Sequence, residues 1–104
     1  MDEHLPEGDW KHLRSVEAVA LNRYCARVLE EVAGVIGRTE GLHHERYLRL
    51  YAVVEDRDRE LARAFNDLRR STAIQHLAGW IRLHLLTDEE LGGFSQDTLE
   101  RARR

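Results

Sequence analysis

The sequence predicts an all-α protein, because three observations favour long helices over strands. The chain has a single proline, Pro6, among 104 residues. None of its segments alternates between apolar and polar residues with the period of two that a strand requires. Residues 42–70 contain neither glycine nor proline and repeat apolar residues with helical spacing. We therefore predict one domain over residues 1–104: a long antiparallel helical hairpin, a third helix and a short C-terminal helical appendage.

Residues 1–8 have no pattern of their own and are expected to form a flexible arm. Asp9 is predicted to be the N-cap of a first helix running from Trp10 to about Gly37. Its apolar stripe consists of Trp10, Leu13, Leu21, Tyr24, Cys25, Val28, Val32 and Val35, widened by Ala18, Leu29 and Ile36. The stripe covers roughly half of the helix circumference, which indicates contact with more than one neighbour.

Residues 42–70 are predicted to form the second helix. Its apolar side carries Tyr47, Leu50, Tyr51, Val54, Leu61, Phe65 and Leu68. The connection over residues 38–41 is short, and short connections between helices place them antiparallel. The charged run at 55–60, EDRDRE, is interpreted as a solvated face with paired charges, such as Glu55 with Arg59 at i,i+4.

Capping signals divide the last third of the chain. Thr72 followed by Gln75 has capping-box spacing, so a third helix is expected over residues 73–86, although one continuous helix over 42–86 is the alternative. Thr87 and Glu90 form a second capping box, which opens a one-turn helix ending at Gly92. Phe94 is expected to pack on the core, and Ser95 to cap a last helix reaching residue 104.

Composition excludes several classes of protein. The net charge of −3 is not that of a polyanion-binding protein. Cys25 is the only cysteine, so an internal disulfide or a cysteine-only zinc site is impossible. No apolar run approaches the ~18 residues of a membrane span, and the acidic N-terminus is unlike a signal peptide, so we expect a cytoplasmic protein without membrane contact. Fifteen arginines against one lysine suggest a high-GC bacterial genome.

Four polar residues within apolar stripes are candidates for a metal site. Glu17, His43, Asp58 and His84 could in principle ligate a metal inside a helical bundle. A di-metal bundle, however, needs two Glu-x-x-His pairs, and residues 40–43 supply only one. We favour structural roles for these residues, in which the two acids pair with arginines or with the Tyr24 hydroxyl. No cofactor or metal is therefore predicted, and the metal-binding bundle is kept as an alternative.

DNA binding and catalysis receive less support. Residues 87–104 have the order of signals typical of a helix-turn-helix, but one turn is too short for its first helix and the second helix ends too soon. A DNA-binding regulator thus stays a second alternative, and nucleic acid is not an expected partner. Cys25 has the position of a small buried hydrophobe, and Gly92-Gly93 alone makes no phosphate loop. We therefore predict no catalytic residues.

The remaining class is an interaction or regulatory protein without catalytic activity. Its apolar and aromatic residues supply more surface than a small helical packing hides, and a self-complementary homodimer would cover it. An unidentified protein partner is the other occupant considered. The predicted interface residues are Trp10, Tyr24, Val28, Val32, Tyr47, Tyr51 and Trp80.

Overall fold

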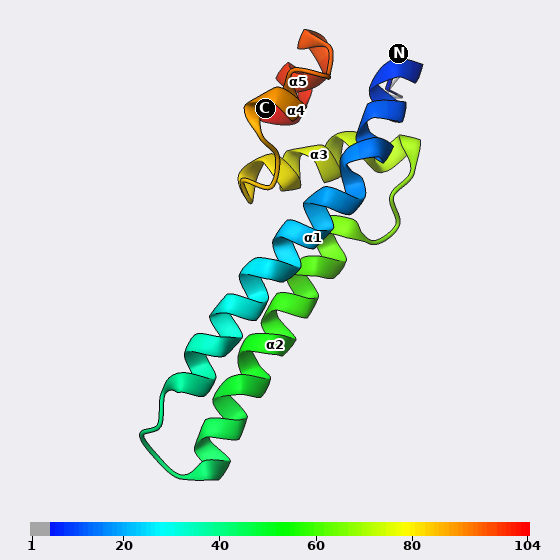
Figure 1. The fold of residues 1–104 in the computed structure, drawn as a ribbon. Helices are drawn as coiled ribbons and strands as arrows, with labels where there is room; N and C mark the ends of the chain where they lie inside the picture. The colour runs from blue at the N-terminus through cyan, green and yellow to red at the C-terminus, as the bar shows by residue number, and fades with distance from the viewer. Residues whose placement is uncertain (1–4) are drawn as a thin grey trace.

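The computed structural model describes residues 5–104, whose regular elements are all helices, with no strand among these residues. The two long helices α1 (Glu7–Gly37) and α2 (His43–Phe65) lie antiparallel, as the short connection predicts. A 3-10 turn, η1 (Arg70–Thr72), leads into α3 (Ala73–Arg82), which crosses one end of this hairpin (Figure 1). The short helices α4 (Asp88–Leu91) and α5 (Gln96–Arg103) complete that end. The predicted all-α class, with its hairpin, third helix and appendage, is confirmed.

The first helix begins earlier than predicted. It starts at Glu7 behind Pro6, whose fixed φ suits a helix entry, so Asp9 lies inside the helix and is not its N-cap. Leu5 is only 2% exposed and belongs to the core, which corrects the prediction of a flexible arm for residues 5–8. The remainder of that predicted arm, residues 1–4, lies outside the described residues.

The second helix ends earlier than predicted, at Phe65 and not at residue 70, so the alternative of one continuous helix over 42–86 is wrong. Two side chains of α3 donate hydrogen bonds to carbonyl groups at the end of α2. The indole Nε1 of Trp80 donates to the carbonyl of Ala64 at 2.8 Å, and His76 Nε2 donates to that of Asn66 at 2.8 Å. Asp67 then adopts a φ of 61°, which turns the chain out of the helix. Distant partners therefore replace the helical hydrogen bonds that the last turn lacks.

The capping signals after α3 are read correctly from the sequence. Glu90 N donates to Thr87 Oγ1 at 3.1 Å and Thr87 N donates to Glu90 Oε1 at 2.8 Å, which makes the predicted capping box around α4. Ser95 Oγ accepts from Thr98 N at the start of α5. The third helix, however, ends at Arg82 and not at residue 86. Arg27 of α1 binds the carbonyls of Leu83 and His84, which satisfies groups that the shortened helix exposes.

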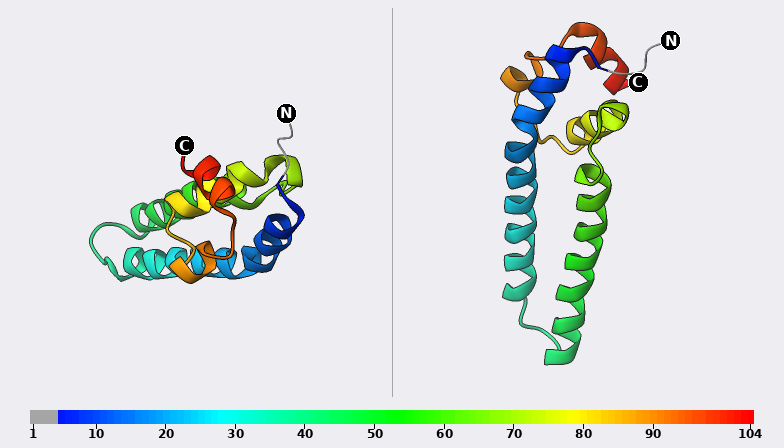
Figure 2. Two further views of the ribbon diagram at one scale, coloured as in Figure 1. Left: turned by 90° about the horizontal axis from the view of Figure 1, so that it is seen from above. Right: turned by 90° about the vertical axis from the view of Figure 1, so that its right-hand side faces the viewer.

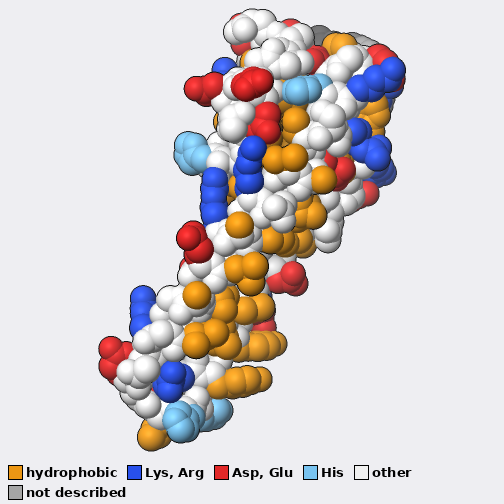
Figure 3. Space-filling view, viewed as in Figure 1, with side chains coloured by type: hydrophobic (Ala, Val, Ile, Leu, Met, Phe, Trp, Pro, Cys, Tyr) orange, Lys and Arg blue, Asp and Glu red, His pale blue; other side chains and the backbone are white. Residues whose placement is uncertain are grey.

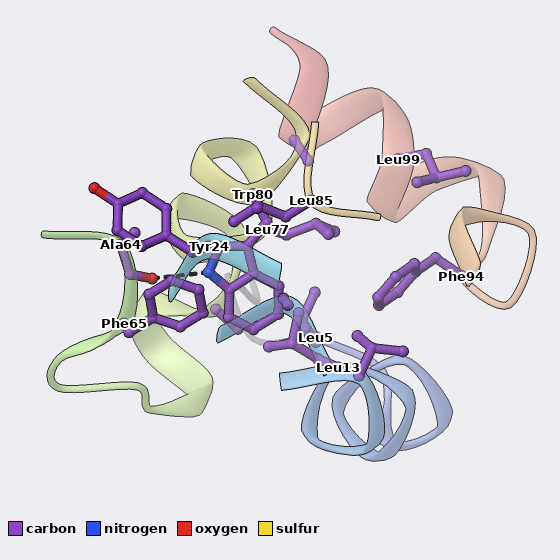
Figure 4. Packing of buried hydrophobic residues seen from close by; sticks show 14 residues of the cluster. Leu5, Leu13, Tyr24, Ala64, Phe65, Leu77, Trp80, Leu85, Phe94 and Leu99 are labelled. Carbon is purple, nitrogen blue, oxygen red and sulfur yellow. Dashed lines mark hydrogen bonds between the residues drawn. The ribbon is translucent and has the colours of Figure 1, made fainter. Parts of the chain in front are cut away.

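The core lies entirely at one end of the hairpin, in a region we call the head. There the first half of α1 and the end of α2 enclose Trp80, which is completely buried and stacks on Phe65 with ring centroids 5.4 Å apart (Figure 4). Phe94 is buried as predicted and contacts the ring of His12 at 4.5 Å. Leu5, the first described residue, and the C-terminal helix α5 both lie at this end (Figure 2). The other half of the hairpin projects away from the head with no third element against it (Figures 1 and 2).

Asp9 connects the beginning of the chain to its end. Its carboxylate is 5% exposed and accepts hydrogen bonds from Ser95 N at 2.8 Å, Ser95 Oγ at 2.7 Å and Thr98 Oγ1 at 2.6 Å. Burial by itself raises the pKa of this carboxyl, but the three donated hydrogen bonds outweigh it and leave the pKa lowered. The charged carboxylate therefore secures the first turn of α5 against α1.

Candidate interaction surface

The projecting half of α1 carries two apolar rows side by side. Both have the alternating spacing of three and four residues that produces one continuous row on a helix. The first row faces α2 and is half-buried: Cys25, Val28, Val32 and Val35. The second row lies roughly 100° further around the helix and is exposed: Ala26, Leu29, Ala33 and Ile36. Leu29 and Ile36 are 69% and 56% exposed, so this second row has no partner within residues 5–104.

The second helix repeats the arrangement. Its half-buried row faces α1 and contains Arg46, Leu50, Val53, Arg57 and Glu60. Its exposed row contains His44, Tyr47, Tyr51, Val54 and Asp58. Tyr47 is 61% exposed and Tyr51 is 55% exposed, and their rings stack with centroids 6.5 Å apart. Each helix thus uses one row to close the hairpin and leaves the other uncovered.

The two exposed rows lie on the same side of the hairpin. A hollow of about 230 Å³ is lined by Leu29 from α1 together with Val54 and Asp58 from α2. A second hollow, of about 300 Å³, is lined by Ile36 and by Tyr47 near the tip of the hairpin. Hydrophobic side chains accordingly run along one flank of the projecting half (Figure 3). We call the two exposed rows together the outer face.

Four of the predicted interface residues belong to this region, whereas three do not. Tyr47 and Tyr51 are on the outer face, and Val28 and Val32 line the hairpin seam beneath it. The prediction was wrong for Tyr24 and Trp80, which are too deeply buried to meet a partner. Tyr24 and Trp80 are buried in the head, and half-buried Trp10 lies there too, under the guanidinium of Arg14 at 5.6 Å. Large aromatic residues serve a core and an interface equally well, so their type alone does not separate the two.

Asp58 has no arginine partner of the kind expected for the two acids, whereas Glu17 has one. Asp58 is exposed at the end of the outer-face row on α2. It makes no hydrogen bond or ion pair among the described residues. Glu17 lies 3.7 Å from Arg14, one of the arginine partners expected for it. The hydroxyl of Tyr24 donates to Glu60 at 2.7 Å and to the carbonyl of Arg57, so it is not a partner of either acid.

The four residues of the alternative metal site are not brought together. Glu17 is in the head half of α1, His43 begins α2 at the hairpin tip, and His84 follows α3 with a φ of 54°. Within residues 5–104, no three His, Cys, Asp or Glu side chains form a group that could hold a metal ion. The metal-binding bundle therefore has no assembled site in this part of the chain.

A polar hollow lies between α2 and α3. It measures about 290 Å³ and is lined by Arg63 and Arg82, with Glu60 at its edge. Glu60 is already engaged by Tyr24 and by Arg57 at 3.3 Å, so it offers little capacity to act as a base. The hollow brings together neither a nucleophile with a base nor a metal group.

Comparisons with protein-family models, curated proteins and solved structures found no match. Among residues 5–104, no helix has both the length and the apolar character needed to cross a bilayer. The outer face is consequently interpreted from its own geometry.

Proposed function

We propose that this chain is a non-enzymatic interaction protein that forms a homodimer through the outer face. The observation that supports it is the second, exposed row on each helix of the projecting hairpin, with Leu29, Ile36, Tyr47, Tyr51 and Val54 between 45% and 69% exposed. A hairpin with two such rows has the pattern of one half of a four-helix bundle. Exposed apolar surface gathered in this way marks a site of association.

A second copy of the chain suits this face because the face complements itself. Small side chains, Ala26 and Ala33, alternate with larger ones on α1, whereas α2 presents the rings of Tyr47 and Tyr51. One copy therefore supplies both the projecting groups and the hollows that an isologous interface requires. The hollows beside Leu29 and Ile36 are the places where a partner's large side chains would enter.

The size of the face also suits a dimer. Residues 43–61 extend for about 28 Å at the helical rise, and two adjacent helices are about 20 Å wide. The resulting flat area is roughly 500–600 Å², and the side chains add relief to it. Standard interfaces bury about 600–1,000 Å² on each partner, so the flat area alone reaches only the lower limit of that range and corresponds to a small interface.

The test compares two exposed leucines. Leu29→Ser removes an anchor of the outer face, whereas Leu42→Ser changes a leucine of matched exposure, 70%, at the hairpin tip outside both rows. By sedimentation velocity at micromolar concentration, the parent and Leu42→Ser should have about twice the chain mass. Leu29→Ser should be monomeric at the same concentration, with an unchanged helical circular dichroism spectrum because residue 29 is outside the core.

Two outcomes contradict the proposal. If the parent protein stays monomeric up to millimolar concentration, it does not form the proposed homodimer. If the dimer persists in both Leu29→Ser and Ile36→Ser, it forms through another surface. The outer face would then be left for a partner other than a second copy of the chain.

A further inference from the structure

We infer that the two copies pack face to face with their hairpins antiparallel, about a two-fold axis that crosses α2 at Tyr51, so that Asp58 pairs with the partner's His44. This inference rests on the proposed homodimer and specifies its geometry. The inference is based on the order of polar and aromatic residues along the exposed row of α2.

The exposed row of α2 is symmetric about its centre. His44 and Asp58 each lie seven residues, two helical turns, from Tyr51, and all three are on the same side of the helix. Suppose that α2 packs antiparallel on the α2 of a second copy, with the axis at Tyr51. A residue that follows Tyr51 by a given number of positions then faces the residue that precedes the partner's Tyr51 by the same number. Asp58 then meets the partner's His44, so that the carboxylate at each end of the row has an imidazole N–H as its donor.

The row on α1 gives the same axis independently. Leu29 lines a hollow with Val54, and Ile36 lines a hollow with Tyr47, so the point midway between Leu29 and Ile36 is level with Tyr51. An axis at that level places Leu29 against the partner's Ile36. One two-fold rotation thus pairs Leu29 with the partner's Ile36 and also pairs Asp58 with the partner's His44.

The other face-to-face arrangement leaves the charges without partners. If the two-fold axis ran along the helices, α2 would face the partner's α1, and Tyr51 would lie over Val32 and Ala33. Asp58 would then be level with Cys25 and Ala26, which offer a carboxylate no donor beyond the weak one of a thiol. A carboxylate enclosed there would lose hydration without compensation. Charge complementarity therefore favours the antiparallel arrangement.

Cysteine cross-linking distinguishes the two arrangements. In a Cys25→Ser background, Tyr51→Cys places a thiol at the axis on α2 and Ala33→Cys places one beside the axis on α1. Each single variant should give a covalent dimer with mild oxidant or a short bis-maleimide. Leu42→Cys, at the hairpin tip, should give none. Under the arrangement with the axis along the helices, neither single variant cross-links, but the double variant Tyr51→Cys/Ala33→Cys does.

Charge exchange tests the pair itself. Asp58→Lys replaces the acceptor of the pair by an ammonium group, which can only donate, and should raise the dimer dissociation constant by about tenfold or more. Adding His44→Asp gives that ammonium group an acceptor and should return the constant to within about threefold of the parent. Asp56→Lys, which changes an exposed carboxylate outside the row, is the matched control and should leave the constant unchanged.

The outcomes separate this geometry from the proposed function. A dimer that forms without cross-linking at position 51, or whose Asp58→Lys variant is not rescued by His44→Asp, overturns the antiparallel axis and leaves the homodimer intact. A monomeric parent overturns both.

Discussion

The carboxylate of Asp9 binds the N-cap residue of α5, Ser95, which lies 86 positions further along the chain. Its Oδ1 accepts from the backbone N–H of Ser95 at 2.8 Å, and its Oδ2 accepts from the Ser95 hydroxyl at 2.7 Å. An acid placed at the first turn of a helix also interacts favourably with the helix dipole. The attachment of α5 to α1 therefore depends on one buried charge.

Replacement of Asp9 should loosen the C-terminal helix. Asp9→Ala strands the buried hydroxyl of Thr98 and removes the acceptor of two Ser95 donors, which should cost roughly 3 kcal/mol of unfolding free energy. Asp97→Ala removes an exposed acid of the same helix, 3.9 Å from Arg101, and should cost less than about 0.5 kcal/mol. Urea titration followed by circular dichroism measures both. Equal losses for the two variants would contradict the role given to Asp9.

The pair between Arg23 and Glu90 predicts an acid-sensitive head. Hydrogen bonds from Arg23, at 2.6 Å, and from the Thr87 backbone lower the pKa of Glu90 to about 2. Because this pKa is lowered in the folded state, the pair contributes stability above the unfolded value of about 4.5. That contribution should be lost as the pH falls from about 4.5 to about 2.

The measurement is the unfolding free energy as a function of pH. Glu90→Gln should flatten the dependence between pH 4.5 and 2, whereas Glu89→Gln, an exposed neighbour in the same helix, should keep the parent's slope. A parent whose stability is independent of pH over this interval would show that Glu90 gains nothing from Arg23.

Two glycines should respond to alanine in opposite directions. Gly79 lies inside α3, and a Cβ there would have only Arg82 Nη2 nearby, at 3.8 Å, so Gly79→Ala should stabilise the protein by roughly 0.5–1 kcal/mol. Gly41 has a φ of +91°, and a Cβ there would come within 2.8 Å of Glu45 Oε2, so Gly41→Ala should destabilise it. Thermal melts of both variants test the pair. Melting shifts of the same sign would refute this explanation.

The two tryptophans should also differ. Trp80→Phe removes the bond to the Ala64 carbonyl and leaves a small cavity at a completely buried site, which should cost roughly 2–4 kcal/mol. Trp10→Phe affects a half-buried ring and should cost less than about 1.5 kcal/mol. Chemical denaturation compares them, and a larger loss for Trp10→Phe would place the centre of the core elsewhere.

The sequence predicts the features that depend on near neighbours. The capping box of Thr87 with Glu90 and the N-cap Ser95 act over three residues, so their signals are complete within a short segment. The hairpin follows from a short connection between two periodic segments. These elements appear in the structure close to their predicted positions.

Features set by distant partners could not be predicted in the same way. Asp9 resembles an N-cap for its own helix, yet it serves a helix at the other end of the chain. The early end of α2 depends on His76 and Trp80, which reach back to its last carbonyls from α3. The wide stripe of α1 indicated two neighbours, but which of its rows α2 covers depends on how the two helices pack, and this is visible only in the structure.

The gathering of the core in the head also determines the order in which the chain can assemble. At the hairpin tip, Arg46 reaches the carbonyl of Ile36 over only 10 positions, whereas Asp9 reaches Thr98 over 89. Closing a short loop costs less chain entropy and takes less time than closing a long one. Contacts at the tip close short loops at a low cost in chain entropy but bury little surface. Contacts in the head bury most of the core but close long loops at a higher entropic cost. The tip should therefore be the first part to pair, whereas the head is complete only after α5, at the end of the chain, has packed against Asp9.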